Sequence, residues 1–486
     1  MFISVRLWQK IIVNRDIELP VVLLTDALIY LLLLLAAGFA VYATRHEHLR
    51  APWRRVGRSR VGVSALVILG FYVAIGLLDS VHFHPREKDL AASDTLVYSP
   101  EILSLLDLWL TPLREHQEKT YSAPFATHLY AKERLELPDG QVIRDYPRLQ
   151  WGGRHLADPH RDRLPDILWN ALRGLFMGLI CWLLVAGLLL WFRARRMGEG
   201  LRRTWALVWA SRTAIPWRAA LLTLGIMSIL GFVAGELAGK YHILGTDKVG
   251  EDVFYQSLKG VRTGLVIGTL TTLVMLPAAI LLGIMAGYFR GLADDIIQYL
   301  YTTLSSIPGV LLIAAAILML QIYMSNHEQD FASLVERADL RLLFLCIILG
   351  VTSWTGLCRL LRGESLKLQE VDYVQAAVAL SVSHATVIGR HILPNVLHIV
   401  LITLVLDFSG LVLAEAVLSY INIGVDPTMD SWGNMINGAR LELAREPMVW
   451  WSLTAAFLFM FTLVLFANLF ADVVRDAFDP RLRDAR

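Results

Sequence analysis

The sequence QEVDYVQAAVALSVSHATVIGRHILPN, residues 369–395, differs in character from the apolar runs on either side of it. It is compatible with helix but only moderately apolar, and it lies between two apolar runs long enough to cross a bilayer, at about 342–361 and 396–418. A helical segment of this composition between two spans has a partner other than lipid. We therefore expect a loop at the membrane surface through which another protein acts on the spans.

Composition indicates a membrane protein with many spans. The chain has 486 residues, of which 56% are hydrophobic, and its mean hydropathy of +0.52 is too high for an ordinary soluble protein. A net charge of +2 gives little support for a nucleic-acid partner. Cys181, Cys346 and Cys358 fall in apolar runs without metal-ligand spacing, so we expect buried thiols, no disulfide framework and no metal site.

Nine apolar runs are long enough to be transmembrane helices. The first begins near Pro20, is longer than the core of a signal peptide and lacks a small-x-small exit, so we interpret it as a span. The expected fold is an all-α polytopic membrane protein with about nine transmembrane helices. The predicted spans are residues 21–43, 61–80, 167–192, 219–238, 264–287, 298–322, 342–361, 396–418 and 450–471.

Arginines predict which loops face the cytoplasm, because short cytoplasmic loops carry an excess of Lys and Arg. The loops after the first and third spans are rich in arginine, against the single acids Glu47 and Glu199. Both loops and residues 369–395 are therefore expected inside, with the N-terminus outside and the C-terminus inside. The alternative, that these arginines are simply solvated, would explain neither their position beside the apolar runs nor their excess over acidic residues. The arginines are Arg45, Arg50, Arg54, Arg55, Arg58 and Arg60, then Arg193, Arg195, Arg196, Arg202, Arg203, Arg212 and Arg218.

The segment between the second and third spans, about residues 81–166, is exported in this orientation. Ser99-Pro100-Glu101 predicts the start of a surface helix with the serine as its N-cap. Residues 135–143 alternate around Asp139-Gly140, which indicates a β-hairpin. We therefore expect a small α+β insertion. Its histidines fit no tight metal pattern and are interpreted as surface residues: His82, His84, His128, His155 and His160.

Three further stretches are more specific. In residues 242–260, Asp247 is placed to cap a following interfacial helix, although an ordinary connector is the alternative. Residues 287–291, GYFRG, supply glycines for a tight inside loop. Residues 306–309, Ser-Ile-Pro-Gly, interrupt the sixth span, and the backbone groups freed by such a break are satisfied within protein or at a water-lined cavity. The break favours a transport pathway. The apolar residues on one face of the expected interfacial helix are Val253, Phe254, Leu258 and Val261.

Four motifs occur in an order seen in one family. HILGTDKVGEDV, then GYFRGLADD with SSIPG, then YVQAAVALSVSHATVIGRHILPN, then LAEAVLSYINIGVDPTMDSWGNMINGAR resemble the permease subunits of bacterial dipeptide, oligopeptide and nickel ABC importers, and more narrowly the C-type member of the permease pair. The resemblance covers about residues 242–479, and weakly 54–79, which is similar to the family's first span. It implies a six-helix core to which this chain adds three spans.

The resemblance implies a permease of the bacterial inner membrane that works with other proteins. In such importers the loop with the EAA pattern forms a coupling helix that docks on an ATPase, and the LGTD and WGN stretches lie on the periplasmic side. The implied partners are a second permease subunit, two ATPase subunits, a periplasmic solute-binding protein and membrane lipid. The implied site residues are Tyr373, Gln375, Ala376, Ala377, Ser381, Arg390, Ile392, Leu393 and Pro394 in the coupling loop, and Gly245, Thr246, Asp247, Gly250, Asp252, Trp432, Gly433 and Asn434 in the periplasmic motifs.

Two positions of the loop depart from the family pattern. Gln375 stands where the pattern has glutamate, and Ser381 stands where it has glycine, which reaches φ > 0 more easily at a bend. Small Ala376 and Ala377 permit another surface to approach closely, and Pro394 is expected to end the loop helix before the next span. From these features alone, an amphipathic helix lying on the inner leaflet is the alternative.

No sequence pattern indicates a nucleotide site in this chain. Residues 235–241, GELAGKY, have the wrong glycine spacing for a P-loop and a tyrosine where Ser or Thr meets magnesium. We expect no enzymatic activity and no cofactor in this chain, with ATP and magnesium in partner ATPases. The pathway candidates are Pro308, Asp407 and Glu415. Asp407 and Glu415, two turns apart, are placed to meet the amino group or metal of a cargo, or else Asp407 pairs with a polar group on a neighbouring helix.

These observations divide the chain into five parts. They are an extra span with a basic loop (1–60), a family-like first span (61–80), the insertion (81–166), an additional helix pair with a basic loop (167–238), and the permease core (239–486) with its coupling loop (362–395). The second or the fourth span takes the place of the family's first. The insertion is expected to contact the binding protein or to cover the periplasmic mouth. Peptides or peptide-like solutes are the expected cargo, although nickel, opines, glutathione and antibiotics share the same motifs. An energy-independent channel or secondary transporter is the alternative function.

Overall fold

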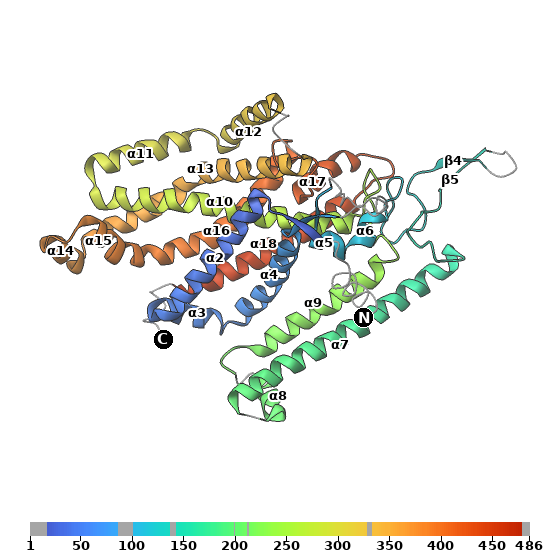
Figure 1. Cartoon of the computed structure of the whole chain (residues 1–486), viewed down its shortest axis with the longest axis horizontal. Coiled ribbons are helices and arrows are strands. Elements are labelled where there is room, and N and C mark those ends of the chain that lie inside the picture. Colours follow the sequence, from blue (N-terminus) through green and yellow to red (C-terminus); the bar gives the residue numbers. More distant parts are fainter. Residues whose placement is uncertain are drawn as a thin grey trace. The chain divides into compact units, whose positions relative to one another are not determined.

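The computed structural model describes residues 17–85, 101–136, 142–198, 200–210, 213–327 and 333–478 (Figure 1). Within these residues, nine helical segments are long and apolar enough to cross a membrane. The predicted all-α polytopic fold is therefore confirmed. The nine segments are α2 (Leu24–Arg45), α4 (Arg60–Asp79), α7 (Pro159–Met197), α9 (Trp217–Ala238), α10 (Val253–Phe289), α12 (Gly309–Asn326), α13 (Leu334–Gln369), the continuous run His384–Tyr420, and α18 (Trp451–Phe478).

The remaining elements are shorter. All three cysteines are free thiols; Cys346 and Cys358 are buried as expected, whereas Cys181 is only half-buried. The other helices are α3 (Glu47–Val56), α5 (Leu105–Trp109), α6 (Thr111–Glu115), α8 (Leu201–Trp209), α11 (Gly291–Ser306), α14 (Asp372–Ala379), α15 (His384–Val387), the π-helical turn η2 (Ile388–Ile392), α16 (Leu393–Tyr420) and α17 (Trp432–Glu442). The strands are β1 (Ile17–Val21), β2 (His82–Pro85), β3 (Leu103–Ser104), β4 (Glu133–Glu136) and β5 (Val142–Asp145).

The chain forms two compact units. Unit 1 comprises Met1–Val22, Arg55–Thr263 and Asp430–Phe466, so it holds the small strands, the insertion and α4 to α9. Unit 2 comprises Leu23–Arg54, Gly264–Met429 and Ala467–Arg486, so it holds α2 and the helices from α11 to α16.

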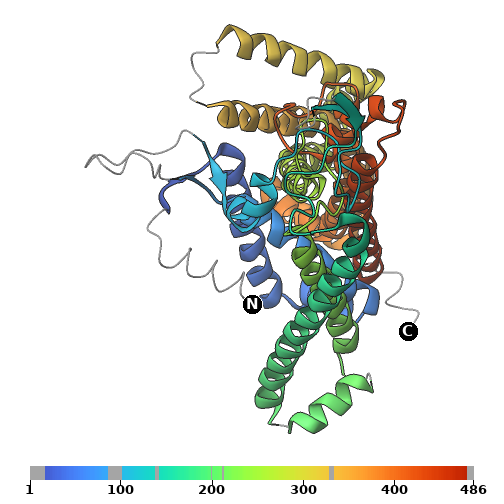
Figure 2. The ribbon, with the colours of Figure 1, turned by 90° about the vertical axis from the view of Figure 1, so that its right-hand side faces the viewer.

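In unit 1, α7 and α9 lie side by side (Figures 1 and 2). A Cβ added at Gly174 or Gly178 would lie 2.7 Å from the Cα atoms of Val233 or Ile229 on α9, so only glycine permits this approach. The two glycines form a GxxxG pattern, which lets membrane helices pack closely. The indole N–H of Trp182 also donates to an α9 carbonyl at 2.7 Å. The predicted additional helix pair is a tightly packed hairpin.

The small strands form two antiparallel sheets in unit 1. β4 and β5 pair as the predicted hairpin, whose turn at Asp139-Gly140 lies outside the described residues. β1, β2 and β3 form a three-stranded sheet. Because β1 pairs with β2, α2 begins at Leu24, three residues after the approximate start predicted for the first span.

The predicted surface helix of the insertion begins later than expected. Ser99-Pro100 lies outside the described residues, and α5 begins at Leu105. Its cap is a reciprocal capping box: the Ser104 hydroxyl accepts the N–H of Asp107 at 3.1 Å, and the Asp107 carboxylate accepts the N–H of Ser104 at 2.9 Å. The helix buries one face, on which Leu106 is fully buried, and exposes the other, on which Trp109 is 53% exposed.

In unit 2, α13 is the central helix, with buried residues facing α10 and α12. Gly350 on α13 allows close packing, since a Cβ there would lie 2.7 Å from the Val274 side chain of α10. The extra leading span α2 joins this unit through its first turn, because the Asp339 carboxylate accepts both the backbone N–H of Thr25, at 3.1 Å, and its hydroxyl. The cluster around α13 includes Val266, Ile267, Leu270, Ile313, Ile317, Leu342, Leu345, Cys346 and Leu349.

Two elements of the core differ in extent from the prediction, although the break in the sixth span is confirmed. α11 ends at Ser306 and α12 begins at Gly309. However, the segment long and apolar enough to cross a membrane is α12 alone and not residues 298–322. The expected interfacial helix is also not separate. Its residues are the first turns of the 37-residue α10, where Val253 and Val261 are buried.

Candidate functional site

Residues 369–395 contain two helical runs joined by a bend. α13 continues to Gln369, so the predicted loop start at residue 362 is too early. α14 follows, and the second run begins at His384. The bend lies at Ser381, whose φ is +58°. It therefore falls where the family resemblance expects glycine, and the serine adopts the backbone conformation that glycine would favour.

Ser381 ends α14 in a Schellman motif. Its N–H donates to the Val378 carbonyl at 2.9 Å, and the N–H of Val382 donates to the Ala377 carbonyl at 3.1 Å. These bonds satisfy carbonyls that a helix end otherwise leaves free. Because the left-handed conformation costs an L-residue roughly 1–2 kcal/mol, Ser381 keeps the bend at an energetic cost that glycine would avoid.

The inner face of this segment packs on unit 2. Val374, Ala377 and Ile392 are buried in one cluster with Tyr288 near the end of α10. The Tyr288 hydroxyl also bonds Nδ1 of His384 at 2.8 Å. Ala377 thus allows α14 to approach its own chain, and it does not belong to the exposed surface expected from its small size. This cluster therefore packs α14 directly against α10.

The outer face of α14 is exposed and partly apolar. Leu380 is 80% exposed and Val378 is 44% exposed, while Gln375 and Ala376 beside them are also exposed. Neighbouring apolar side chains on a loop outside the spans are typical of a protein contact. The EAA pattern drew attention to Ala376 and Ala377 and away from Val378 and Leu380, which sequence reasoning missed.

The other predicted loop residues surround the start of α16. The side-chain amide of Asn395 donates to the Tyr373 hydroxyl at 3.0 Å, which ties α14 to α16. Arg390 is exposed and Leu393 is half-buried. Pro394 does not end a helix as predicted, because the helical run continues through it. It lies in the first turn of α16, directly after the wider π-helical turn, where its missing N–H is tolerated.

Two ion pairs join the turn before α11 and the first turn of α11 to the C-terminal end of α13 and its C-cap. Arg362 donates from Nε and Nη2 to the two oxygens of Asp294, at 2.5 and 2.7 Å, and these hydrogen bonds lower the pKa of Asp294. Arg290 pairs with Glu370 at 2.9 Å. The turn itself lies at Arg290, with φ of +53°. Gly287, predicted in that turn, lies instead inside α10 and packs against α13.

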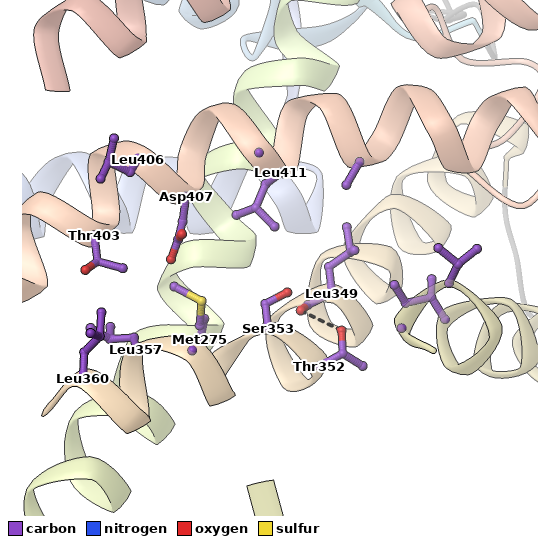
Figure 3. Close-up of a pocket in the computed structure, with 16 residues that line it drawn as sticks. Met275, Leu349, Thr352, Ser353, Leu357, Leu360, Thr403, Leu406, Asp407 and Leu411 are labelled. Atoms are coloured by element: carbon purple, nitrogen blue, oxygen red, sulfur yellow. Dashed lines mark hydrogen bonds between the residues drawn. The ribbon is translucent and has the colours of Figure 1, made fainter. Parts of the chain in front are cut away.

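A cavity of about 640 Å³ lies in unit 2 among α10, α12, α13 and α16 (Figure 3). Its wall is mainly apolar with a few hydroxyl groups. Pro308 does not line it, but Gly309, the last residue of the predicted break, does. The lining residues are Met275, Gly309, Val310, Ile313, Leu349, Thr352, Ser353, Gly356, Leu357, Leu360, Thr403, Leu406, Asp407, Gly410, Leu411 and Ala414.

Asp407 is the only ionisable residue among those that line the cavity. Its half-buried side chain points into the cavity (Figure 3), and within the described chain it makes no hydrogen bond or ion pair. The expected alternative of a partner on a neighbouring helix is therefore not found there. Glu415 does not line the cavity. It is 2% exposed and accepts the hydroxyl of Ser419 at 2.7 Å, so the two carboxylates do not form one site.

The LGTD motif in unit 1 is enclosed by the insertion. Thr246 is fully buried, donates its hydroxyl to the Thr120 carbonyl at 2.9 Å and accepts the N–H of Ser122 at 2.7 Å. Gly245 and Gly250 have φ of +71° and +84°, and a Cβ at either would collide with the backbone of the insertion. The two glycines thus allow the backbone of the insertion to pack directly against the LGTD motif.

Asp252, and not Asp247, caps α10. Its Oδ1 accepts the backbone N–H groups of Phe254 and Tyr255 at 2.8 and 3.1 Å. Asp247 closes its own turn, where it accepts the N–H of Val249 at 3.0 Å. The predicted cap is wrong because Asp252 directly precedes the first helical residue, which is the N-cap position.

A buried charged cluster joins the insertion to the same turn. His242 bonds Asp252 at 2.7 Å through Nδ1 and Glu118 at 3.4 Å through Nε2, and none of the three side chains is more than 4% exposed. Burial lowers the pKa of His242, but its hydrogen bonds to the two carboxylates outweigh burial and raise the pKa to about 9. Burial raises the pKa of Glu118, but His242 and three backbone N–H groups of residues 150–152 lower it overall. A histidinium therefore lies between two carboxylates.

The WGN motif begins α17 and is buried in unit 1. Trp432 is 1% exposed, donates its indole N–H to the Ser257 carbonyl at 3.0 Å and packs against Gly260. Gly433 is buried, and the N–H of Asn434 donates to the N-cap serine at 3.0 Å. The motif holds α17 on α10, and its tryptophan presents no surface to an external partner.

Sequence reasoning missed one further buried cluster in unit 1. Lys259 on α10 pairs with Asp79 at the end of α4, at 2.6 Å, and with Asp107 of α5, at 3.0 Å. The hydroxyl of Tyr255 donates to Asp107 at 2.7 Å. Burial raises the pKa of Asp107, but Lys259 and the hydrogen bonds lower it overall. The cluster connects α4, the insertion and α10, and no sequence pattern links these distant residues.

Comparison with known proteins identifies the family. Residues 279–484 match the model of the family described as binding-protein-dependent transport system inner membrane component. The glutathione transport system permease protein of Pectobacterium atrosepticum is 31% identical over 244 residues, which cover 50% of this chain and 73% of that protein. The oligopeptide transport system permease protein of Haemophilus influenzae is 30% identical, with coverages of 50% and 71%. The dipeptide transport system permease protein of Lactococcus lactis is 30% identical over 49% of this chain and 64% of that protein. This chain belongs to the family of binding-protein-dependent transport permeases and is a multi-pass inner-membrane permease subunit of an ABC importer.

Proposed function

We propose that this permease pairs with a second permease subunit and that two ATPase subunits drive the pair, with ATP and magnesium bound in the ATPases. The observation that carries this proposal is the two-faced α14. Its exposed face, with Val378 and Leu380, offers a docking surface, while its buried face is fixed to α10 through Val374 and Ala377. A docking helix held this firmly passes a rigid-body movement of its partner to the spans.

The proposed orientation places α14 in the cytoplasm. It follows from the arginine-rich loops after α2 and α7, because cytoplasmic loops carry the excess of positive charge. With nine spans, the N-terminus is then periplasmic and the C-terminus cytoplasmic. The LGTD motif, the WGN motif and the insertion then face the periplasm, where the solute-binding protein docks.

We assign α4, and not α9, to the place of the family's first span. Within unit 1, Tyr72 of α4 donates its hydroxyl to the Phe459 carbonyl of α18 at 2.9 Å, and its ring lies 6.5 Å from that of Trp432. Asp79 at the end of α4 pairs with Lys259 of α10. By contrast, α9 packs mainly on α7 and on α4. The contacts with α10, α17 and α18 support α4 as part of the core.

The insertion is proposed to contact the solute-binding protein. Its charged link through Glu118 and His242 to the LGTD turn supports a fixed platform and not a loosely tethered domain. The family's periplasmic motifs are buried beneath it, so the insertion supplies the surface that these motifs do not expose. A variant that lacks the insertion should therefore bind the loaded binding protein more weakly.

The cargo is proposed to be a peptide or peptide-like solute with a free amino group. The cavity lined by Asp407 has apolar walls and a single carboxylate, and a carboxylate near hydroxyl groups suits one ammonium group. A divalent metal ion would require more oxygen or nitrogen ligands than one carboxylate provides. The relatives named for peptide and glutathione transport support the same cargo class.

Purification of the tagged chain under conditions that retain native complexes tests the proposed assembly. The expected result is a complex that contains two ATPase subunits and a second permease. Transport activity by this chain alone, without an ATPase, would contradict the proposal.

A further inference from the structure

The short helix α8 lies at the joined ends of α7 and α9 (Figures 1 and 2). Both neighbours are membrane-spanning helices, and the connections on either side of α8 are short, residues 198–200 and 210–216. Connectivity therefore holds α8 at the level where the two spans leave the bilayer. Its side chains face the hairpin, the headgroup layer or the aqueous phase.

One face of α8 packs on the hairpin and another face is uncovered. Thr204 and Val208 are buried, and Val208 packs in a cluster with α7 and α9 residues. Leu201, Trp205 and Trp209, spaced four residues apart, are 51%, 41% and 39% exposed. This spacing places them in one row along the helix. An exposed apolar row with tryptophans is typical of a helix that lies in the membrane interface.

Arginines surround this row without acidic partners in the described part of the chain. Arg195, Arg202, Arg203 and Arg218 are exposed, and the ion pairs among described residues involve none of them. Two of them instead lie over indole rings of α7 and α8. Arg195 Cζ is 5.3 Å from the ring centroid of Trp191, and Arg218 Cζ is 5.4 Å from that of Trp209.

The indole rings orient these guanidinium groups without neutralising them. A cation over an aromatic face keeps its full charge, and the planar guanidinium can still bind phosphate through its free N–H edges. Trp205 and Trp209 also contact each other edge to face, with centroids 5.6 Å apart. The result is an aromatic row beside a group of positive charges that form no ion pair with described residues.

We propose that α8 and the adjoining ends of α7 and α9 bind anionic phospholipid of the inner leaflet. Trp205 and Trp209 lie at the boundary between headgroups and acyl chains, and Arg195, Arg202 and Arg203 bind the phosphate of the headgroup. A zwitterionic lipid satisfies the apolar row but leaves the positive charge uncompensated, so the site prefers phospholipid with net negative charge. The site lies outside the coupling loop and adds a lipid requirement to the permease.

The test compares two double variants of the full chain in its native complex. Arg202→Gln/Arg203→Gln removes two charges from the site, while the control Arg134→Gln/Arg144→Gln removes two exposed charges from the β4–β5 hairpin. Each complex is purified in mixed micelles of phosphatidylglycerol and phosphatidylcholine, and the retained lipids are quantified by mass spectrometry. Each lost arginine should lower the preference for phosphatidylglycerol roughly fivefold, and the control should keep the preference of the unchanged protein.

A second measurement reports the depth of the aromatic row. Phosphatidylglycerol with brominated acyl chains should quench tryptophan fluorescence in the unchanged protein, and the quenched part should be smaller in Trp205→Phe/Trp209→Phe.

An unchanged lipid preference in Arg202→Gln/Arg203→Gln, or an equal loss in both charge variants, would overturn the proposal. Loss of a protein subunit with the lipid preference intact would assign this face to a protein partner instead.

Discussion

Replacing Ser381 with glycine should stabilise the bend of the coupling loop. The serine has φ of +58°, and this conformation costs an L-residue roughly 1–2 kcal/mol that glycine avoids. Part of the gain is offset, because glycine loses more conformational freedom when the loop orders, so we expect a net gain of about 1 kcal/mol. Such a gain corresponds to about a fivefold shift of the local opening equilibrium.

Hydrogen exchange at Val382 measures this change directly, because its N–H donates to the Ala377 carbonyl only when the bend is closed. The amide should exchange about fivefold more slowly in Ser381→Gly. The same substitution two residues away is a matched control. Ser383 has φ of −58° and caps α15, so Ser383→Gly should destabilise the loop by a few tenths of a kcal/mol. Equal effects of the two substitutions, or faster exchange in Ser381→Gly, would refute the assignment of the bend.

Four further outcomes are expected. Glu118→Gln should destabilise unit 1 by about 3 kcal/mol, measured by thermal unfolding of the purified complex, because it leaves buried His242 with one carboxylate. The stabilisation from protonated His242 should be complete below pH 6.5 and lost as pH rises to about 9, and this loss should be smaller in Glu118→Gln. Asp407→Asn should raise the KM for peptide uptake roughly 10- to 100-fold at equal expression, and unchanged uptake would exclude the cargo role. Gly178→Leu should destabilise the α7–α9 hairpin by about 1–3 kcal/mol, whereas Gly187→Leu, with no neighbour within 4 Å, should not.

Local sequence patterns predicted those elements that depend only on residues close together in the sequence. The nine spans follow from apolar length, and the break after Ser306 follows from the Ile-Pro-Gly sequence. The bend at Ser381 was predicted from the position of this residue within the family motif, although a serine favours such a bend less than the glycine of the pattern. The GxxxG pattern at Gly174 and Gly178 was equally available in the sequence and would have predicted the close packing of α7 on α9.

Long-range contacts decided what sequence patterns did not predict. Asp247 and Asp252 are both plausible caps in sequence, and only the position of α10 relative to each distinguishes them. The salt bridges of Lys259 join residues separated by more than 150 positions, so no local pattern signals them. Leu380 resembles an ordinary helical leucine until burial of the opposite face shows that it points outward.

Photo-crosslinking from Leu380 tests whether α14 docks on an ATPase subunit. A photoreactive amino acid at this position, where the side chain is 80% exposed, should crosslink to an ATPase subunit in the assembled, transport-competent complex. The same amino acid at Leu441, which is 72% exposed on α17, should give no ATPase crosslink, because the proposed orientation places α17 in the periplasm. No ATPase crosslink from position 380 in a complex that transports, or an ATPase crosslink from position 441, would contradict the proposed docking of α14.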